Sequence, residues 1–80
     1  MSRQHHYLKT ETEYYQAIES GDKKFEIRVC DRLFEKYDMI YLEEVVNGEK
    51  TGRSLPPLEI KYVLKGGKFG LRSGFCIINW

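Results

Sequence analysis

The densest group of side chains capable of chemistry lies in Gly21-Asp22-Lys23-Lys24-Phe25-Glu26-Ile27-Arg28. Glu26 and Arg28 are two residues apart, so on a strand they share a face with Lys24. A carboxylate flanked by cations stays ionised and is held in place. Such a cluster could grip a base edge and a phosphate together, because Arg presents a fork of donors and Glu accepts from an amino group. The competing interpretation is a solvated face whose ion pairs contribute about 0–1 kcal/mol each.

Other charged residues could join this cluster. Lys9 precedes the expected helix, and Arg32 follows the expected strand. Arg53 could be presented to an anion by an edge loop, or it could be an ordinary exposed cation. His5 and His6 could be ligands or acid–base groups, but no partner cluster lies near them in the sequence.

No established catalytic motif accompanies these residues. The sequence contains no nucleophile elbow, phosphate-binding loop or dinucleotide fingerprint. The two cysteines, Cys30 and Cys76, form no CxxC pair, so neither a zinc site nor a disulfide scaffold is expected. We expect two reduced thiols in or near the core, and no metal or cofactor.

The elements that must position the cluster begin with one helix. A Thr10–Glu13 capping box predicts that the helix starts at residue 10. Tyr14 and Ile18 recur at helical spacing, and Gly21 can adopt the left-handed conformation that ends helices.

After Gly21 the pattern favours strands. Alternating side chains predict strands over residues 24–30, 39–46, 58–65 and 74–80, with a short one at 49–53 after an Asn47-Gly48 hairpin turn. One helix and about five strands predict a small α+β fold built as a mostly antiparallel β-barrel. The aromatic residues expected in its core are Phe25, Tyr62 and Phe75. Those left free to stack on bases are Tyr15, Tyr41 and Phe69.

Composition fits one soluble domain over residues 1–80. Hydrophobic residues make up 41% of the chain and charged residues 31%, which argues against disorder. No apolar run approaches the ~18 residues of a membrane helix, and the N-terminus lacks the apolar core of a secretion signal. We therefore expect a cytoplasmic protein without a membrane partner. The net charge is only +1, but Lys61–Trp80 contains four bases and no acid, so one face could still be basic.

The order of the motifs resembles the ASCH superfamily, and within it a small phage and bacterial branch of unknown function. The resemblance covers nearly the whole chain and rests on His6-x-Leu8-Lys9, Gly21-x-Lys23-x-Phe25-Glu26-Ile27-Arg28, Asp31-Arg32, Thr51-Gly52-Arg53, Tyr62-Val63-Leu64 and Gly70-Leu71. It implies a PUA-like barrel whose cleft binds RNA or a nucleotide. Lys23, Glu26 and Arg28 would line that cleft, with Lys9 and Arg32 beside them. The family often has Gly-Asp before the second strand, whereas Tyr37 precedes Asp38 here.

A second branch of the superfamily contains small amidohydrolases that act on N4-acetylcytidine. Lys23 matches the lysine of that branch, but Glu26 stands where its threonine would be expected. In that alternative Lys23 and Glu26 are the candidate catalytic residues, Lys23 activated by desolvation and Glu26 as general base.

The expected function is therefore an RNA- or nucleotide-binding module without chemistry. Its binding residues are expected to be Lys9, Lys23, Glu26, Arg28, Arg32 and Arg53. Single-stranded RNA is favoured over duplex DNA, because no basic recognition helix is available. The alternatives are an amidohydrolase for acylated cytidine and a protein-interaction module, which a large exposed apolar patch would favour. The sequence does not specify the oligomeric state.

Overall fold

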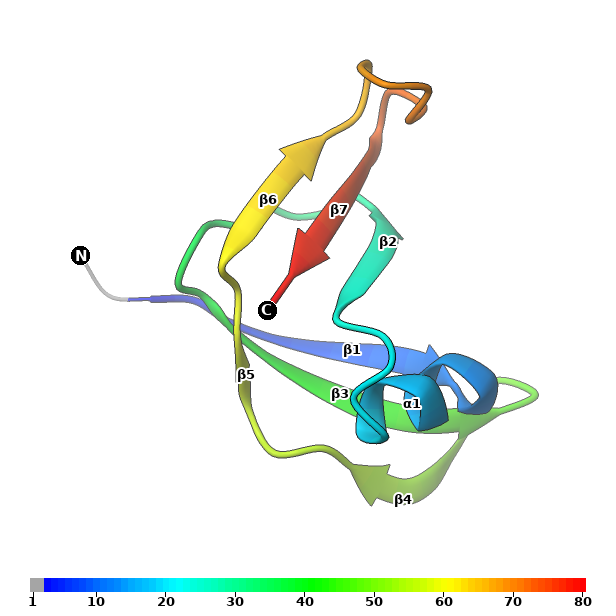
Figure 1. The fold of residues 1–80 in the computed structure, drawn as a ribbon. Coiled ribbons are helices and arrows are strands. Elements are labelled where there is room, and N and C mark those ends of the chain that lie inside the picture. The colour runs from blue at the N-terminus through cyan, green and yellow to red at the C-terminus, as the bar shows by residue number, and fades with distance from the viewer. Residues whose placement is uncertain (1–2) are drawn as a thin grey trace.

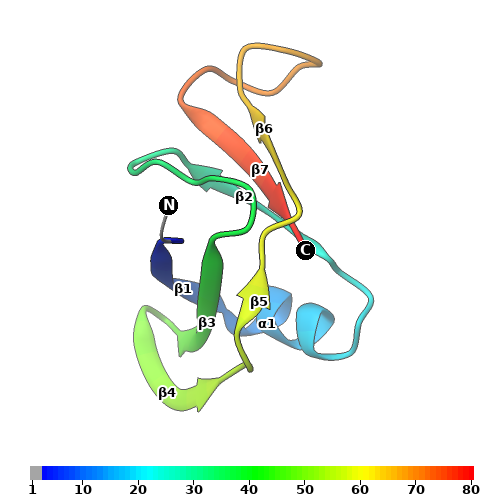
Figure 2. The ribbon, with the colours of Figure 1, turned by 90° about the vertical axis from the view of Figure 1, so that its left-hand side faces the viewer.

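The computed structural model describes residues 3–80 and contains one helix and two sheets (Figure 1). The elements in chain order are β1 (His5–Glu11), α1 (Thr12–Glu19), β2 (Phe25–Val29), β3 (Met39–Val46), β4 (Glu49–Ser54), β5 (Leu58–Glu59), β6 (Tyr62–Lys65) and β7 (Phe75–Asn79). In both views of the ribbon, the sheet of β2, β7 and β6 stands above the sheet of β1, β3 and β4 (Figures 1 and 2). The helix lies beside the lower sheet.

The first sheet has the order β1-β3-β4, and β5 also pairs with β3. The β1–β3 pairing is parallel and sets Leu8 opposite Leu42 and Thr10 opposite Glu44. The other pairings in this sheet are antiparallel. The sequence interpretation assigned no strand to residues 5–9, because the buried positions of β1 alternate as His6, Leu8 and Thr10 with only one aliphatic side chain.

The second sheet has the order β2-β7-β6 and is antiparallel. Its inner face carries Glu26 opposite Ile78 and Arg28 opposite Cys76. Within residues 3–80 the strands form two separate sheets, with no ladder joining β1 to β2. The α+β class with one helix and mostly strands is therefore confirmed, whereas no closed barrel is found in this part of the chain.

The core lies between the two sheets, and Ile18 of the helix packs into it. Ile40 and Leu42, the inward pair expected on the second predicted strand, are completely buried. The residues that form the core cluster are Leu8, Ile18, Phe34, Ile40, Leu42, Ile60, Cys76 and Ile78. Both sheets and the helix contribute, so burial of this cluster fixes their relative positions.

The helix begins two residues later than predicted. Thr10 belongs to β1, and its buried Oγ1 has no hydrogen-bond partner among residues 3–80, so the capping box is wrong. Glu11 is the N-cap residue and makes no side-chain capping bond. The parallel pairing of Thr10 with Glu44 extends the strand past the point where the local pattern begins a helix. Tyr15 is buried, whereas Tyr14 is exposed.

The later boundaries agree closely with the pattern. Strands β2, β3 and β7 match their predictions within one residue at each end. Asn47 and Gly48 form the expected turn, with φ of 52° and 82°. The strand predicted over 58–65 is divided between β5 and β6, because Ile60 leaves the ladder and its carbonyl accepts the Tyr37 amide at 2.7 Å. Tyr37 itself is 51% exposed and has a φ of 76°, a left-handed conformation that favours glycine.

The second sheet turns the opposite face toward the core from the one that the sequence predicted. Phe25 and Tyr62, expected in the core, are 43% and 61% exposed, and Phe75 is only partly buried. Glu26, on the other face of β2, is 6% exposed. The charged face of β2 therefore points inward and the apolar face points outward, which is the reverse of the usual arrangement.

Candidate functional site

A cleft of about 640 Å³ lies between β1 and β2. Its walls come from both strands, the helix and the segment after β2. The lining residues are Leu8, Lys9, Glu11, Tyr14, Lys23, Phe25, Glu26, Ile27, Arg28, Val29, Asp31, Arg32 and Phe75. Its volume falls in the range typical of small-molecule sites, about 300–1,000 Å³.

The cleft exists because two sheet edges face each other without pairing. β1 is an edge strand of its sheet, and β2 is an edge strand of the other. A side chain bridges the two strands: Arg28 Nη1 donates to the carbonyl oxygen of Lys9 at 3.3 Å. Backbone groups along both edges thus remain available to a ligand, together with the side chains.

Glu26 is the centre of the site. It is 6% exposed, and its two carboxylate oxygens accept from different cations. Lys23 Nζ donates to Oε1, and Arg28 Nη1 lies 3.3 Å from Oε2. The Lys23 backbone amide donates to the carbonyl of Ala17 at 3.0 Å. This hydrogen bond to the last turn of α1 fixes the position of the Lys23 backbone. The structure therefore brings Lys23, Glu26 and Arg28 together, in place of a solvated charged face.

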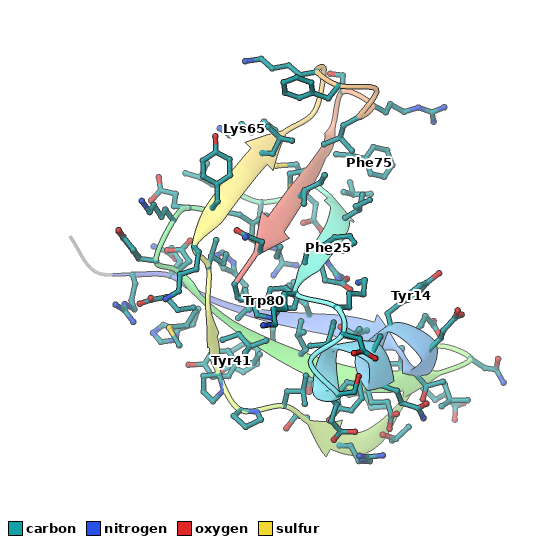
Figure 3. All side chains as sticks on the ribbon, in the orientation of Figure 1. Tyr14, Phe25, Tyr41, Lys65, Phe75 and Trp80 are labelled. Atoms are coloured by element: carbon teal, nitrogen blue, oxygen red, sulfur yellow. The ribbon has the colours of Figure 1, made fainter. Side chains whose placement is uncertain are left out.

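Aromatic rings flank the lysine. Lys23 Nζ is 5.2 Å from the centre of the Tyr14 ring and 5.1 Å from that of the Phe25 ring, both within cation–π range. Figure 3 shows Tyr14 on α1 and Phe25 at the start of β2, and both line the cleft. The site thus combines fixed charges with two exposed rings.

The other charged lining residues are Lys9, Arg32, Asp31 and Glu11, and Glu11 is exposed without an ion pair among residues 3–80. Lys9 is exposed and forms no ion pair with any residue from 3 to 80. Arg32 Nε lies 3.2 Å from the Asp31 carboxylate, and its guanidinium lies over the Phe34 ring at 5.9 Å. Glu26 forms ion pairs with two cations, and Asp31 forms one with Arg32. The groups that remain for an anionic ligand are Lys9 and the N–H donors of Arg28 and Arg32 that these ion pairs do not use.

Arg53 lies outside the cleft. Its guanidinium Nη2 contacts Glu19 at 2.9 Å, and the group lies over the Tyr15 ring at 5.6 Å. It also approaches the buried Glu44 at 4.0 Å. The structure thus assigns Arg53 to a separate ion-pair group on β4 and α1, away from the other predicted binding residues.

The sequence interpretation missed the group around Glu44. Thr12 Oγ1 donates to one carboxylate oxygen at 2.7 Å and Thr51 Oγ1 to the other at 2.8 Å. These hydrogen bonds, opposed by burial and aided by Arg53, lower the pKa of Glu44 below its usual value. No local spacing relates the three elements, so only the sheet pairing could have revealed the group.

His6 pairs with a partner that the sequence did not indicate. Its Nε2 lies 2.9 Å from Asp38 Oδ2, and both side chains are buried. Asp38 also accepts from the backbone amides of Gln4 and Glu35, each at 3.0 Å. Burial acts to raise the pKa of Asp38, but the hydrogen bonds from His6 and the two amides outweigh it and lower that pKa. These hydrogen bonds connect β1 and the residue before it to the loop that precedes β3.

The remaining candidates divide between core and surface. Tyr15 is buried and unavailable for stacking, whereas Phe69 is 90% exposed. Tyr41 stacks on Tyr7 with ring centres 4.6 Å apart. Cys30 and Cys76 are both free thiols, and burial together with a hydrogen bond to Cys30 raises the pKa of Cys76 to about 11.

No group of three or more His, Cys, Asp or Glu within residues 3–80 is placed to hold a metal ion. No helix in the same part of the chain is long and apolar enough to cross a membrane.

A family model described as Domain of unknown function (DUF3850) matches residues 5–80. The chain belongs to this family. No curated protein matches the sequence. Since the matched range runs from the first residue of β1 past the end of β7, the whole cleft lies within the DUF3850 domain.

Proposed function

We propose that this DUF3850 domain is an RNA- or nucleotide-binding module of the ASCH type, with a PUA-like arrangement open between β1 and β2, and that it works in the cytoplasm. The observation that carries the proposal is the convergence of Lys23, Glu26 and Arg28 at the cleft. The order of motifs that resembles the ASCH superfamily supports the same reading.

The chemistry of the lining suits a nucleotide. Arg28 has further N–H donors for a phosphate or a base edge, and Lys9 is exposed and unpaired within residues 3–80. Tyr14 and Phe25 offer ring faces at the same cleft, where a base can stack. A cleft of this size accommodates an exposed base of a single strand better than the outside of a duplex, so single-stranded RNA is the favoured ligand.

Binding of a fluorescently labelled, short single-stranded RNA of mixed sequence tests the proposal. We expect measurable affinity at low salt. Arg28→Met should lower it by at least about tenfold, ~1.4 kcal/mol, because the aliphatic stem remains while the donors are lost. Circular dichroism should confirm that the variant is folded.

Arg53→Met is the matched control, since Arg53 is also an ion-paired arginine but lies outside the cleft. Its RNA affinity should equal that of the unmodified protein. The proposal fails if no RNA binding is detected at low salt, or if the folded Arg28→Met and Arg53→Met variants bind equally well.

A second candidate is an amidohydrolase for acylated cytidine, favoured by the direct contact of Lys23 with Glu26 in the cleft. In this reaction water would cleave the amide and release the acid and the free amine. Both oxygens of Glu26 already accept from cations, so a general base would first need one of them released. Absence of turnover of N4-acetylcytidine at high enzyme concentration would eliminate this candidate.

A further inference from the structure

The face of β1 and β3 that points away from the core carries a stack of aromatic rings. Tyr7 lies directly opposite Tyr41 in the parallel ladder, and their ring centres are 4.6 Å apart with 14° between the ring planes. His5 also stacks on Tyr41, at 5.7 Å, and its Nδ1 lies 2.7 Å from the Tyr41 hydroxyl oxygen. In Figure 3 Tyr41 lies well apart from Tyr14 and Phe25, the two rings at the cleft. A nucleotide in the cleft therefore leaves this stack unused.

One side of the Tyr7 ring is open. The ring separation of 4.6 Å matches the spacing of neighbouring strands, about 4.7–4.9 Å, so the two tyrosine rings stack across the ladder. The other side of the Tyr7 ring then turns away from β3, toward the edge of β1 that pairs with no strand within residues 3–80. Tyr7 is 63% exposed, and no further ring or cation in this part of the chain stacks on it. A flat ring from a ligand can therefore extend the stack at the edge of β1.

The same edge of β1 forms a wall of the cleft. Lys9 follows Tyr7 on the same face of β1, about 7 Å along the strand, and it lines the cleft. Lys9 is exposed and forms no ion pair among residues 3–80, whereas Glu43 opposite it is paired with Lys50 at 3.3 Å. Glu11 lies beyond Lys9, on the far side from Tyr7. One unpaired cation thus borders both the cleft and the open ring of Tyr7.

We propose that single-stranded RNA bound at the cleft continues onto this face. The nucleotide next to the one in the cleft stacks its base on Tyr7, and Lys9 holds the phosphate between the two nucleotides. The inference rests on the proposed RNA binding and adds a second base to it. Every base has a π-face, so stacking on a tyrosine accepts any of them. The Tyr7 ring therefore adds affinity for a strand without selecting its sequence.

The chemistry of the face favours RNA over a protein partner. The outward positions of β1 are His5, Tyr7, Lys9 and Glu11, and none of them is aliphatic. The centre of a protein interface is instead a continuous apolar patch that is depleted of charged residues. Exposed rings beside an unpaired cation are the combination that binds a single strand, through base stacking and phosphate contact.

Two short RNAs of equal length test the inference. One carries a base on every nucleotide, and the other keeps a single base and is abasic elsewhere, so both present the same phosphates. Fluorescence titration at low salt gives the preference of each protein variant for the complete RNA. We expect this preference to be at least about fivefold larger in the unmodified protein than in Tyr7→Thr, since the variant has no ring on which a second base can stack.

The variants separate the ring from the fold. Tyr7→Thr keeps a β-branched residue suited to a strand, and Tyr7→Phe keeps the ring and should retain the full preference. Tyr62→Thr is the matched control, because Tyr62 is 61% exposed but lies on β6 of the other sheet and does not line the cleft. It should bind both RNAs like the unmodified protein. Circular dichroism should confirm that each variant is folded.

Equal preference for the complete RNA in the folded Tyr7→Thr and Tyr62→Thr variants overturns the inference. Weaker binding of both RNAs by the same factor in Tyr7→Thr also overturns it, because the ring then contacts no base. In either case, loss of affinity in Arg28→Met still supports RNA binding in the cleft. If Tyr7→Thr loses the preference while Arg28→Met binds the complete RNA normally, RNA stacks on Tyr7 without entering the cleft. The proposed function is then wrong, and so is the path from the cleft to Tyr7.

Discussion

At the scale of single residues, Glu26 decides the character of the site. A buried carboxylate is unfavourable unless cations and hydrogen bonds compensate it. Here Lys23 and Arg28 supply that compensation, and in turn Glu26 holds both cations at the edge of the cleft. Removing its charge would leave two neighbouring cations without their shared partner, so the residue links stability to the geometry of binding.

We expect Glu26→Gln to lower the free energy of unfolding by about 1–3 kcal/mol, because the amide cannot replace a charged acceptor for both cations. Urea unfolding monitored by circular dichroism measures the change. Glu11→Gln is the control, as Glu11 lines the same cleft but is exposed, and it should shift stability by less than about 0.5 kcal/mol. Equal stability of the two variants would contradict the role given to Glu26.

Local spacing was enough to place Glu26 and Arg28 together, because strand alternation is a short-range feature. It gave Lys24 as the lysine on their face, whereas Lys24 is exposed and Lys23, which the family resemblance indicated, contacts Glu26. It was not enough for Arg53, whose partners Glu19 and Glu44 come from distant elements. Alternation also gave the two faces of β2 correctly, yet not which of them is buried. Which face of β2 is buried depends on β1 and α1, which pack around Glu26 and form the other walls of the cleft. The sequence of β2 alone carries no information on these distant elements.

At the scale of elements, Asp38 fixes the position of the loop between β2 and β3. Its carboxylate joins the start of β1 to this loop through His6 and two backbone amides. The parallel pairing of β1 with β3 begins at this point, with His5 opposite Met39. Local patterns predicted β3 and the Asn47-Gly48 hairpin, but the β1–β3 pairing spans about half the chain and has no local signal.

The lowered pKa of Asp38 makes the folded state favour its ionised form. The stabilisation should therefore be complete above the ordinary value of 3.8, and it should be lost as pH falls through the lowered pKa. Asp38→Asn should cost about 1–3 kcal/mol at neutral pH, with the difference from the unmodified protein shrinking in acid.

Urea unfolding across a pH series from neutral to below the ordinary pKa of Asp38 checks this expectation. Asp22→Asn is the control, because Asp22 is exposed and has no ion pair within residues 3–80. Its stability should follow that of the unmodified protein at every pH. A penalty for Asp38→Asn that stays constant into acid would show that charge on Asp38 does not stabilise the fold.

At the scale of the whole molecule, charge is separated over a chain whose net charge is only +1. The cleft pairs Glu26 and Asp31 with its own cations and leaves Glu11 exposed. The outward-facing residues of β2, β7 and β6 carry no charge, and the loop over 66–74 is basic. RNA would thus meet few free cations, mainly Lys9, Arg28 and Arg32. Binding should then depend on salt much less than for a protein with an extended basic surface.

If those three side chains contact phosphates, the logarithm of the RNA association constant should fall against the logarithm of salt with a slope of about −2. Fluorescence titrations at several salt concentrations give this slope. Lys9→Met should make it shallower by about 0.7, as expected when one phosphate contact is lost. If Arg28 reads a base edge, Arg28→Met should instead weaken binding at an unchanged slope, because a base contact releases no counterion. A slope far steeper than −2 would mean more phosphate contacts than the three cations of the cleft can make, and would contradict binding confined to the cleft.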